Sequence, residues 1–188
     1  GLVAKLTEWV DGGGCFLGVN EPSAARGFDT FFRMAHVLGV DEDTGERVCH
    51  GKWSFPAEEP GELIPKGCRI RGRSGRFTDG NARVFLREGE SPSLSVHSFG
   101  KGCGIYLSSY EVTPENTRLL LNLILYGTGC PLKQEYLTDN PRTECAFFPK
   151  SKVLAVINQA ETAESCAVRT EKGVQNFCLK PWELQIRR

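Results

Sequence analysis

Hydrophobic positions follow two different patterns along this chain, and the change falls near residue 130. Before it, apolar residues at helical spacing alternate with short apolar runs. A first helix is predicted by four such residues: Leu2, Leu6, Trp9 and Val10. Residues 15–19 then form a continuous apolar run, which is typical of a strand buried on both faces of a parallel sheet. After residue 131 no helical period occurs.

The first part of the chain alternates predicted helices and strands. A second helix is predicted by five apolar residues closed by Gly39: Phe28, Phe31, Phe32, Ala35 and Leu38. Strands are predicted over 83–86, 94–96 and 103–107. A further helix begins at Thr113 and Pro114, which suit the N-cap and first helical positions. We therefore expect an α/β layered domain over residues 1–130, of the class I glutamine-amidotransferase-like or flavodoxin-like kind.

The predicted domain departs from a complete α/β domain in two ways. Residues 41–80 are rich in Gly, Pro and charge, and we interpret them as an excursion from it. The chain also opens on a helix followed by an internal strand, which indicates an N-terminally truncated domain and the C-terminal piece of a longer protein. A sheet without its first strands should expose an edge.

The last part of the chain is predicted to be all β. Five short apolar runs with turn residues between them cover 145–148, 153–157, 165–168, 177–179 and 183–186. Strands so short and so regularly spaced predict a small β-sandwich domain over residues 131–188.

Composition narrows the class of protein. The chain has 188 residues with 23 basic and 23 acidic side chains, so no net field recruits nucleic acid or an anionic membrane. No run of 18 apolar residues occurs. Eight cysteines at scattered spacing indicate reduced thiols in a cytoplasmic protein. The three histidines do not pair with cysteines at ligand spacing, so we predict no metal site.

The turn after residues 15–19 is where an α/β domain usually places its active site. The amidotransferase layout needs a nucleophilic Cys at this turn, but the position holds Asn20, and no His follows the strand at 103–107. We therefore predict no catalytic residue in this chain. An active amidotransferase or hydrolase is the disfavoured interpretation, and Cys15 would be its candidate nucleophile. Asn20 and Glu21 either hydrogen-bond a polar ligand at a substrate rim or serve as turn and helix-cap residues.

Two further groups have alternative interpretations. Trp53 and Phe55 in the excursion either stack on a sugar at the substrate rim or anchor the loop. A basic cluster either contacts phosphate or is a solvated loop that faces acids such as Glu58, Glu59 and Glu62; it comprises Arg69, Arg71, Arg73 and Arg76.

Four segments in order resemble one family. They are GGGCFLGVNEPSA, FFRMAHVLGVD, FGKGCGIYLSSYEVTPENTRLLLNLILYGTG and EYLTDNPRTECAFFPKSKVLAVINQ. Together they resemble the lacto-N-biose/galacto-N-biose phosphorylases (1,3-β-galactosyl-N-acetylhexosamine phosphorylases), a family that also holds galactosyl-rhamnose phosphorylases. The resemblance runs nearly end to end and is weakest over residues 45–80.

The resemblance implies an architecture and a reaction. Members have an N-terminal (β/α)8 barrel, a middle amidotransferase-like domain and a small C-terminal β domain. They cleave a β-galactoside reversibly with inorganic phosphate, with inversion, to α-galactose 1-phosphate. No cofactor is involved, and the general acid lies on the barrel. The disaccharide therefore binds through the barrel, which is part of the same protein or a separate N-terminal polypeptide, and a homodimer is possible within this picture.

Two functions follow as expectations. The first is the C-terminal portion of such a hexosyltransferase, serving as a non-catalytic scaffold, active-site rim and association domain. The alternative is a stand-alone carbohydrate-binding or interaction module with a catalytically silent fold.

Overall fold

The computed structural model describes residues 1–25, 31–42, 57–59, 61–78 and 80–188. Its helices are α1 (Leu2–Asp11), α2 (Ala35–Leu38) and α3 (Pro114–Gly127). The strands before α3 are β1 (Cys15–Val19), β2 (Ala24–Ala25), β3 (Phe31–Phe32), β4 (Val40–Glu42), β5 (Arg76–Thr78), β6 (Arg83–Glu88), β7 (Ser91–Phe99) and β8 (Gly102–Leu107). Those after it are β9 (Thr143–Phe148), β10 (Val153–Asn158), β11 (Glu164–Thr170), β12 (Gly173–Leu179) and β13 (Leu184–Arg187).

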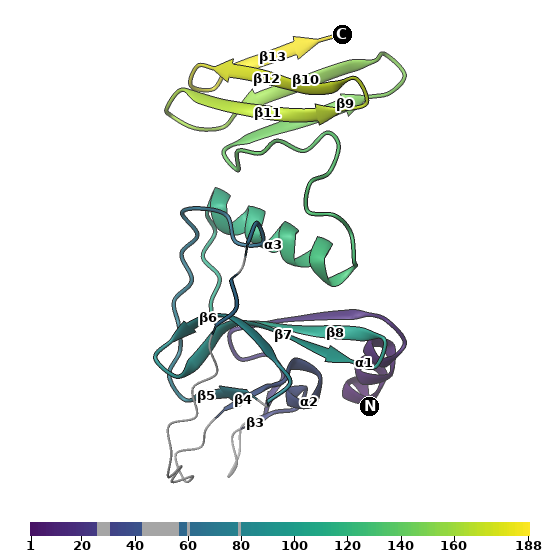
Figure 1. The fold of residues 1–188 in the computed structure, drawn as a ribbon, viewed down its shortest axis with the longest axis vertical. Helices are drawn as coiled ribbons and strands as arrows, with labels where there is room; N and C mark the ends of the chain where they lie inside the picture. Colours follow the sequence, from purple (N-terminus) through teal and green to yellow (C-terminus); the bar gives the residue numbers. More distant parts are fainter. Residues whose placement is uncertain (26–30, 43–56, 60, 79) are drawn as a thin grey trace.

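A four-stranded sheet organises the first region, in the order β1-β8-β7-β6. Helix α3 covers one face of this sheet, and α1 and α2 lie on the other side (Figure 1). On the α3 face, Leu119 and Leu123 pack against Ile105 and Leu107 of β8. On the opposite face, Val10 and Val37 pack with Tyr106. The sheet is therefore buried on both faces, as the apolar runs predict.

The predicted fold class is wrong. Among the described strands, only β1 and β8 are parallel, while β8, β7 and β6 form antiparallel hairpins. The remaining strands form small separate sheets, and the three helices have only 10, 4 and 14 residues. A mostly β-stranded chain with one parallel pair is not an amidotransferase-like or flavodoxin-like α/β domain, which repeats strand–helix–strand crossovers through a parallel sheet.

The expected second helix is the main local error. Phe31 and Phe32 form strand β3, which pairs with β2, and only one helical turn follows at Ala35–Leu38. Phe28 lies outside the described residues. Gly39 does end that turn, with a left-handed φ of 64°. The aromatic residues have the right spacing for a helix, but in the short ribbon Phe32 is buried and Phe31 is exposed.

The other predicted elements before residue 130 form. Helix α1 and strands β1, β6, β7 and β8 appear where the pattern placed them. In α3 the Thr113 Oγ1 accepts a hydrogen bond from the Asn116 backbone N–H, at 3.1 Å, so this N-cap is confirmed. Part of the 41–80 excursion lies outside the described residues, but its two ends meet, because β4 pairs with β5.

All five strands predicted after residue 131 form. They make a three-stranded sheet, β13-β10-β9, and a two-stranded sheet, β11-β12. The two sheets face each other at the top of Figure 1. Their inward side chains alternate along the strands and include Leu154, Val156, Cys166, Val168, Phe177 and Leu179. We call residues 136–187 the small β region. The division of the chain at residues 130 and 131 stays a prediction.

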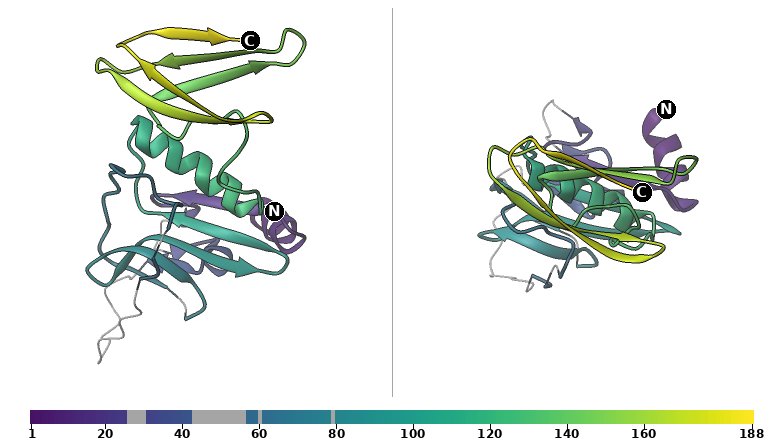
Figure 2. Two further views of the ribbon diagram at one scale, coloured as in Figure 1. Left: turned by 45° about the horizontal axis from the view of Figure 1, so that its top comes forward. Right: turned by 90° about the horizontal axis from the view of Figure 1, so that it is seen from above.

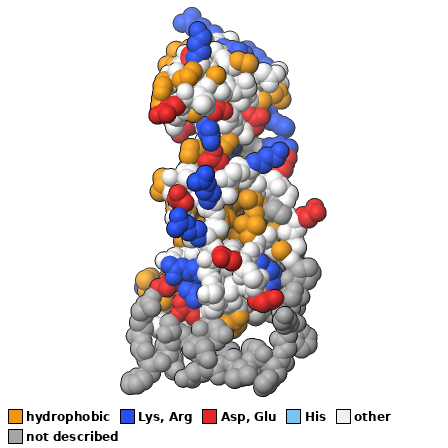
Figure 3. Space-filling view, turned by 90° about the vertical axis from the view of Figure 1, so that its left-hand side faces the viewer, with side chains coloured by type: hydrophobic (Ala, Val, Ile, Leu, Met, Phe, Trp, Pro, Cys, Tyr) orange, Lys and Arg blue, Asp and Glu red, His pale blue; other side chains and the backbone are white. Residues whose placement is uncertain are grey.

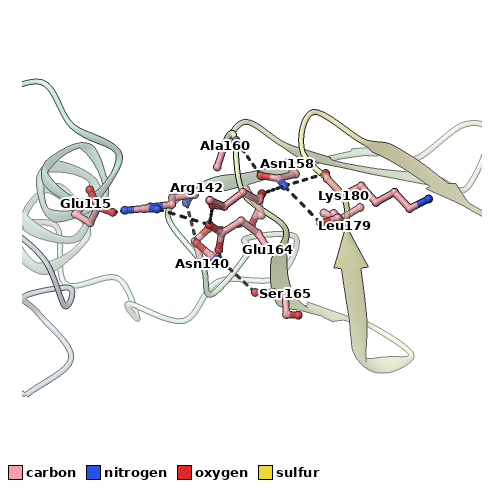
Figure 4. A network of polar contacts seen from close by, with 11 residues as sticks. Glu115, Asn140, Arg142, Asn158, Ala160, Glu164, Ser165, Leu179 and Lys180 are labelled. Atoms are coloured by element: carbon pink, nitrogen blue, oxygen red, sulfur yellow. Dashed lines mark hydrogen bonds and ion pairs between the residues drawn. The ribbon is translucent and has the colours of Figure 1, made fainter.

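The small β region sits beyond α3, which lies between it and the four-stranded sheet (Figure 2). Side chains of both charge signs are interspersed on the face shown in Figure 3. A polar contact joins the two regions. The Arg142 guanidinium lies 3.0 Å from Glu115 of α3 and 3.7 Å from Glu164 of β11 (Figure 4). Arg118 of α3 also donates to the Thr138 carbonyl.

Candidate functional site at the carboxyl ends of β1 and β8

The turn that follows β1 holds the two described rim candidates, Asn20 and Glu21. Asn20 has a φ of 66° and Ser23 a φ of 59°, both in the left-handed region. Gly18 of β1 allows Pro22 of the turn to pack closely against the strand, because a Cβ at position 18 would lie 2.7 Å from the Pro22 Cβ. The Asn20 backbone N–H donates to the Leu107 carbonyl at 2.8 Å, and its carbonyl accepts from the Tyr106 hydroxyl. The turn is therefore tied to the end of β8.

An extended basic segment, residues 69–73, runs beside this turn. Its backbone is held by the loop between β8 and α3: the Arg71 N–H donates to the Ser109 Oγ at 2.7 Å, and the Ser108 hydroxyl donates to the Arg71 carbonyl at 2.8 Å. The Asn116 side chain bonds both backbone groups of Arg69. Arginine side chains at 69, 71 and 73 are thereby set at the carboxyl ends of β1 and β8.

A chain of ion pairs lies beneath the turn. The Arg73 Nη1 is 3.1 Å from the Glu21 Oε1, and the Arg76 Nη2 is 2.8 Å from the Glu42 Oε1. Arg76 and Glu42 are buried, with 8% and 7% of their side chains exposed. The Arg76 guanidinium also lies over the Phe32 ring. These carboxylates are not the partners that the sequence suggested, because Glu58 pairs with Arg83 and Glu62 with Lys133.

The buried pair is incompletely satisfied. In the described part of the chain, the Glu42 Oε2 and the Arg76 Nε have no hydrogen-bond partner. A buried ion pair recovers its desolvation cost only when its remaining polar atoms are satisfied. Burial also raises the pKa of Tyr106 against the opposing effect of Arg76, so its hydroxyl stays protonated and can donate.

Above the ion pairs is an open cleft of about 440 Å³. Asn20 and Glu111 line it together with the basic segment, Ser109 and Tyr110. We call this the carboxyl-edge cleft. Three guanidinium groups, an amide and hydroxyls can hydrogen-bond the oxygen atoms of a phosphate or a sugar. The observed side chains therefore suit a polar, oxygen-rich ligand or protein surface.

The sequence predicted part of this site. Asn20 lines the cleft, whereas Glu21 lies beside it in an ion pair with Arg73, and a ligand contact by either residue stays a prediction. Trp53 and Phe55 lie outside the described residues. Sequence reasoning missed Ser109, Tyr110 and Glu111. Their position directly after β8, parallel to β1, is the signal that would have identified them.

Cys15 is poorly suited to act as a nucleophile. It lies beside Cys103 on the paired parallel strands, and both side chains are half-buried. The hydrogen bond between the two thiols and their burial raise the pKa of Cys15, while the same hydrogen bond lowers the pKa of Cys103 to about 7. The two groups share one hydrogen bond, so the pair loses its first proton more easily and its second much less easily. All seven cysteines that the structure describes are free.

Within the described residues, no cluster of three or more His, Cys, Asp or Glu side chains could hold a metal ion. No helix among them has the length and apolar character needed to cross a membrane.

Comparison with protein families matches most of the chain. Residues 1–131 match the model described as "Lacto-N-biose phosphorylase central domain", and residues 136–187 match "Lacto-N-biose phosphorylase C-terminal domain".

Two curated relatives illustrate the similarity. One is a D-galactosyl-β-1→4-L-rhamnose phosphorylase of Lachnoclostridium phytofermentans, 46% identical over 173 residues, covering 92% of this chain and 24% of that protein. Another is a 1,3-β-galactosyl-N-acetylhexosamine phosphorylase of Bifidobacterium longum subsp. longum, 29% identical over 211 residues, covering 92% of this chain and 28% of that protein. The chain thus spans about a quarter of the length of these relatives.

A solved structure shows the fold. A β-galactosidase from Rahnella sp. R3 superposes with a TM-score of 0.53 at 15% identity, over 99% of this chain and 30% of that one. At this identity the likeness concerns the fold alone. It replaces the amidotransferase-like assignment with the fold of a segment of that β-galactosidase.

Proposed function

The chain belongs to the lacto-N-biose phosphorylase family, and we propose that it is the C-terminal portion of an enzyme that cleaves a β-galactoside reversibly with inorganic phosphate. In this reaction a phosphate oxygen attacks the anomeric carbon and the bond to the leaving sugar breaks. The product is α-galactose 1-phosphate, and an acid protonates the leaving oxygen. The observation that carries the proposal is the pair of consecutive family matches over residues 1–131 and 136–187.

The role of this segment in the proposal is that of a non-catalytic scaffold and active-site rim. The catalytic acid belongs to a barrel elsewhere in the longer protein, which also binds the disaccharide. The carboxyl-edge cleft supports the rim role, because it presents arginine side chains on a backbone held by several hydrogen bonds. Arg71 is exposed and has no ion-pair partner among the described residues.

An association surface is the second part of the proposal. Strand β1 is an edge of the four-stranded sheet as described, and an open groove of about 600 Å³ lies beside it. Trp9 and Ile124 line the groove, and about half of each side chain is exposed. We assign this edge to an extended strand from the remainder of the phosphorylase, since the relatives are about four times longer than the chain.

The test is an assay of galactose 1-phosphate release from galactosyl-rhamnose, lacto-N-biose or galacto-N-biose with inorganic phosphate. The 188-residue chain alone should release none, and the longer protein that contains it should release the product from at least one of them. Release by the chain alone would overturn the non-catalytic role. No release by the longer protein from any of the three substrates would overturn the reaction.

A matched pair of variants of the longer protein tests the rim. Arg71→Gln removes a cation from the carboxyl-edge cleft, and we expect a higher KM with the kcat nearly unchanged, because the contact is made equally in the ground and transition states. Arg169→Gln, an exposed residue of β11, is the control. Equal kinetics for both variants would remove the rim from the proposal and leave the reaction untouched.

A further inference from the structure

Most of the strained non-glycine backbone in the described residues lies at two places. Five non-glycine residues in the described ranges have a positive φ: Asn20, Ser23, Tyr136, Lys152 and Trp182. The first two form the turn at the carboxyl-edge cleft. Tyr136, with a φ of 57°, and Lys152, with a φ of 53°, both line a second cleft in the small β region. A bulky or long side chain in this conformation costs free energy, and such residues cluster where the side chain has a task.

The second cleft, which we call the sandwich-end cleft, lies where one end of the two facing sheets opens. Its volume is about 290 Å³, close to the lower end of the usual range for small-molecule sites, roughly 300–1,000 Å³. Its walls come from the β9–β10 turn, the β11–β12 turn and the end of β13, and Leu154 is part of its lining. Several separate segments thus converge on one concave surface.

The charge of this cleft is one-sided. Lys152, Lys172 and Arg187 line it, with Glu171 as the acid, although the whole chain has 23 residues of each sign. Among the described residues, Lys152 and Lys172 have no ion-pair partner. Clustered cations without carboxylate partners repel one another and favour an anionic ligand.

Arg187 is held in place within this cluster. Its guanidinium lies 3.9 Å from the centre of the Phe177 ring, and its Nη2 donates to the Asn176 carbonyl at 3.0 Å. These contacts occupy one face of the guanidinium and one of its N–H groups, so its remaining N–H groups can donate hydrogen bonds to a ligand. A guanidinium fixed in this way loses little conformational freedom when it binds an anion.

Another part of the lining is aromatic, and its Phe147 lies on the same three-stranded sheet as Arg187. The Tyr136 and Phe147 rings are stacked, with centroids 4.1 Å apart and planes 4° from parallel. Partial burial and the Glu171 carboxylate raise the pKa of Tyr136, so its hydroxyl stays protonated as a donor. A flat ring with a donor at its edge suits an organic group that has one apolar face and several oxygen atoms.

We propose that the sandwich-end cleft binds a small phosphate ester, with the phosphate on Lys152, Lys172 and Arg187 and the organic group against Tyr136 and Phe147. The site lies in the small β region, separate from the carboxyl-edge cleft, and does not depend on the proposed reaction. Free inorganic phosphate shares the charged part of this chemistry but not the aromatic part. Comparing the two ligands therefore separates a phosphate site from a phosphate-ester site.

The experiment is calorimetric titration of the 188-residue chain with galactose 1-phosphate, inorganic phosphate and galactose at millimolar concentration. Galactose 1-phosphate should bind more tightly than inorganic phosphate, and galactose should give no measurable heat. The doubly substituted variant Lys152→Gln/Lys172→Gln should lose about tenfold or more of the affinity for the ester. The control Lys5→Gln/Lys180→Gln removes the same charge elsewhere and should bind as the unmodified chain does.

A second variant tests the aromatic wall. Phe147→Leu keeps an apolar side chain of similar size, and it should reduce the affinity for galactose 1-phosphate toward that for inorganic phosphate. Thermal unfolding of each variant checks that the region is folded. No heat with either phosphate ligand, or equal losses in the two lysine variants, would overturn the proposal. Equal affinity for galactose 1-phosphate and inorganic phosphate would overturn its ester part.

Discussion

The two regions of this molecule handle buried polar groups differently. In the described residues, every buried side-chain atom without a hydrogen-bond partner belongs to the first region, in Glu42, Arg76, Arg87 and Ser95. The small β region instead satisfies its buried Asn158, whose amide donates to the Thr162 and Lys180 carbonyls and whose Oδ1 accepts from the Ala160 N–H (Figure 4). The second region thus satisfies its buried polar side chain, whereas the first leaves polar atoms unsatisfied, including those of the Glu42–Arg76 pair near the turn that carries Glu21.

Removing one partner of the buried ion pair should show the largest effect of this contrast. Glu42→Ala leaves the buried Arg76 guanidinium with only the more distant Glu21 carboxylate, at 3.7 Å, so we expect a loss of about 3 kcal/mol in the free energy of unfolding. Urea unfolding followed by circular dichroism measures it. The paired change Glu42→Leu/Arg76→Met should be nearly neutral. A single variant as stable as the unmodified chain would show that the pair is solvated and would remove the contrast.

A smaller loss is expected from the satisfied network in the small β region. Asn158→Ala removes a buried side-chain amide that donates to the Thr162 and Lys180 carbonyls and accepts from the Ala160 N–H, which should cost about 1–3 kcal/mol. Asn176→Ala, at an exposed position of β12, is the matched control and should change stability by less than about 0.5 kcal/mol. The same unfolding measurement compares them. If both variants lost equal stability, Asn158 would not be the organising polar group of its region.

The helix between the two regions provides a third measurement. Thr113→Ala removes the hydroxyl that accepts from the Asn116 N–H and should cost about 1 kcal/mol. Thr113→Ser keeps the acceptor and should recover most of this loss. Hydrogen exchange in the first turn of α3 localises the effect. No difference between the two variants would mean that solvent replaces the cap.

The smallest effect is expected at the contact between the regions. The pKa of Glu164 is lowered, chiefly by a hydrogen bond from Asn140 and also by Arg142. The pKa of Glu115 is lowered too: burial alone would raise it, but hydrogen bonds from its own backbone N–H and from Arg142 outweigh burial. A lowered folded-state pKa stabilises the protein above the ordinary glutamate pKa, about 4.3, and this stability is lost as the pH falls through the lowered value.

Urea midpoints of the unmodified chain and Arg142→Gln, measured between about pH 3 and pH 7, test that direction. The two curves should differ slightly near neutrality and converge at acidic pH. High salt should reduce the difference at neutral pH, because Arg142 is exposed. Curves that diverge as the pH falls would contradict the lowered pKa values of Glu115 and Glu164.

Local residue patterns also predict the structure of the two regions with different accuracy. All five strands of the small β region were predicted, because strand alternation and turn residues are local signals. In the first region, the spacing of Phe31, Phe32 and Leu38 favoured a helix, but Phe31 and Phe32 pair with β2 in a ribbon and the helix is confined to Ala35–Leu38. The fold class was wrong for a related reason, since parallel and antiparallel neighbours leave no distinct mark on a buried apolar strand.

Only those residues of the candidate site that a local sequence pattern marks were predicted. Asn20 and Glu21 follow directly from the end of an apolar strand, and the arginine spacing is visible at 69, 71, 73 and 76. Their partners were not predictable, since Glu42 reaches Arg76 from a strand more than 30 residues away. Local residue order cannot show which of several acids a guanidinium will meet.

The sequence by itself determined the turns, the caps, most strands and the family, because each depends on neighbouring residues or on ordered segments. The tertiary structure alone decided the pairing of β1 with β8, the burial of Arg76 with Glu42 and the convergence of Tyr136, Lys152 and Lys172 on one cleft. Those features join residues far apart in the chain, and the free energy that unites them comes from packing and burial rather than from local conformation.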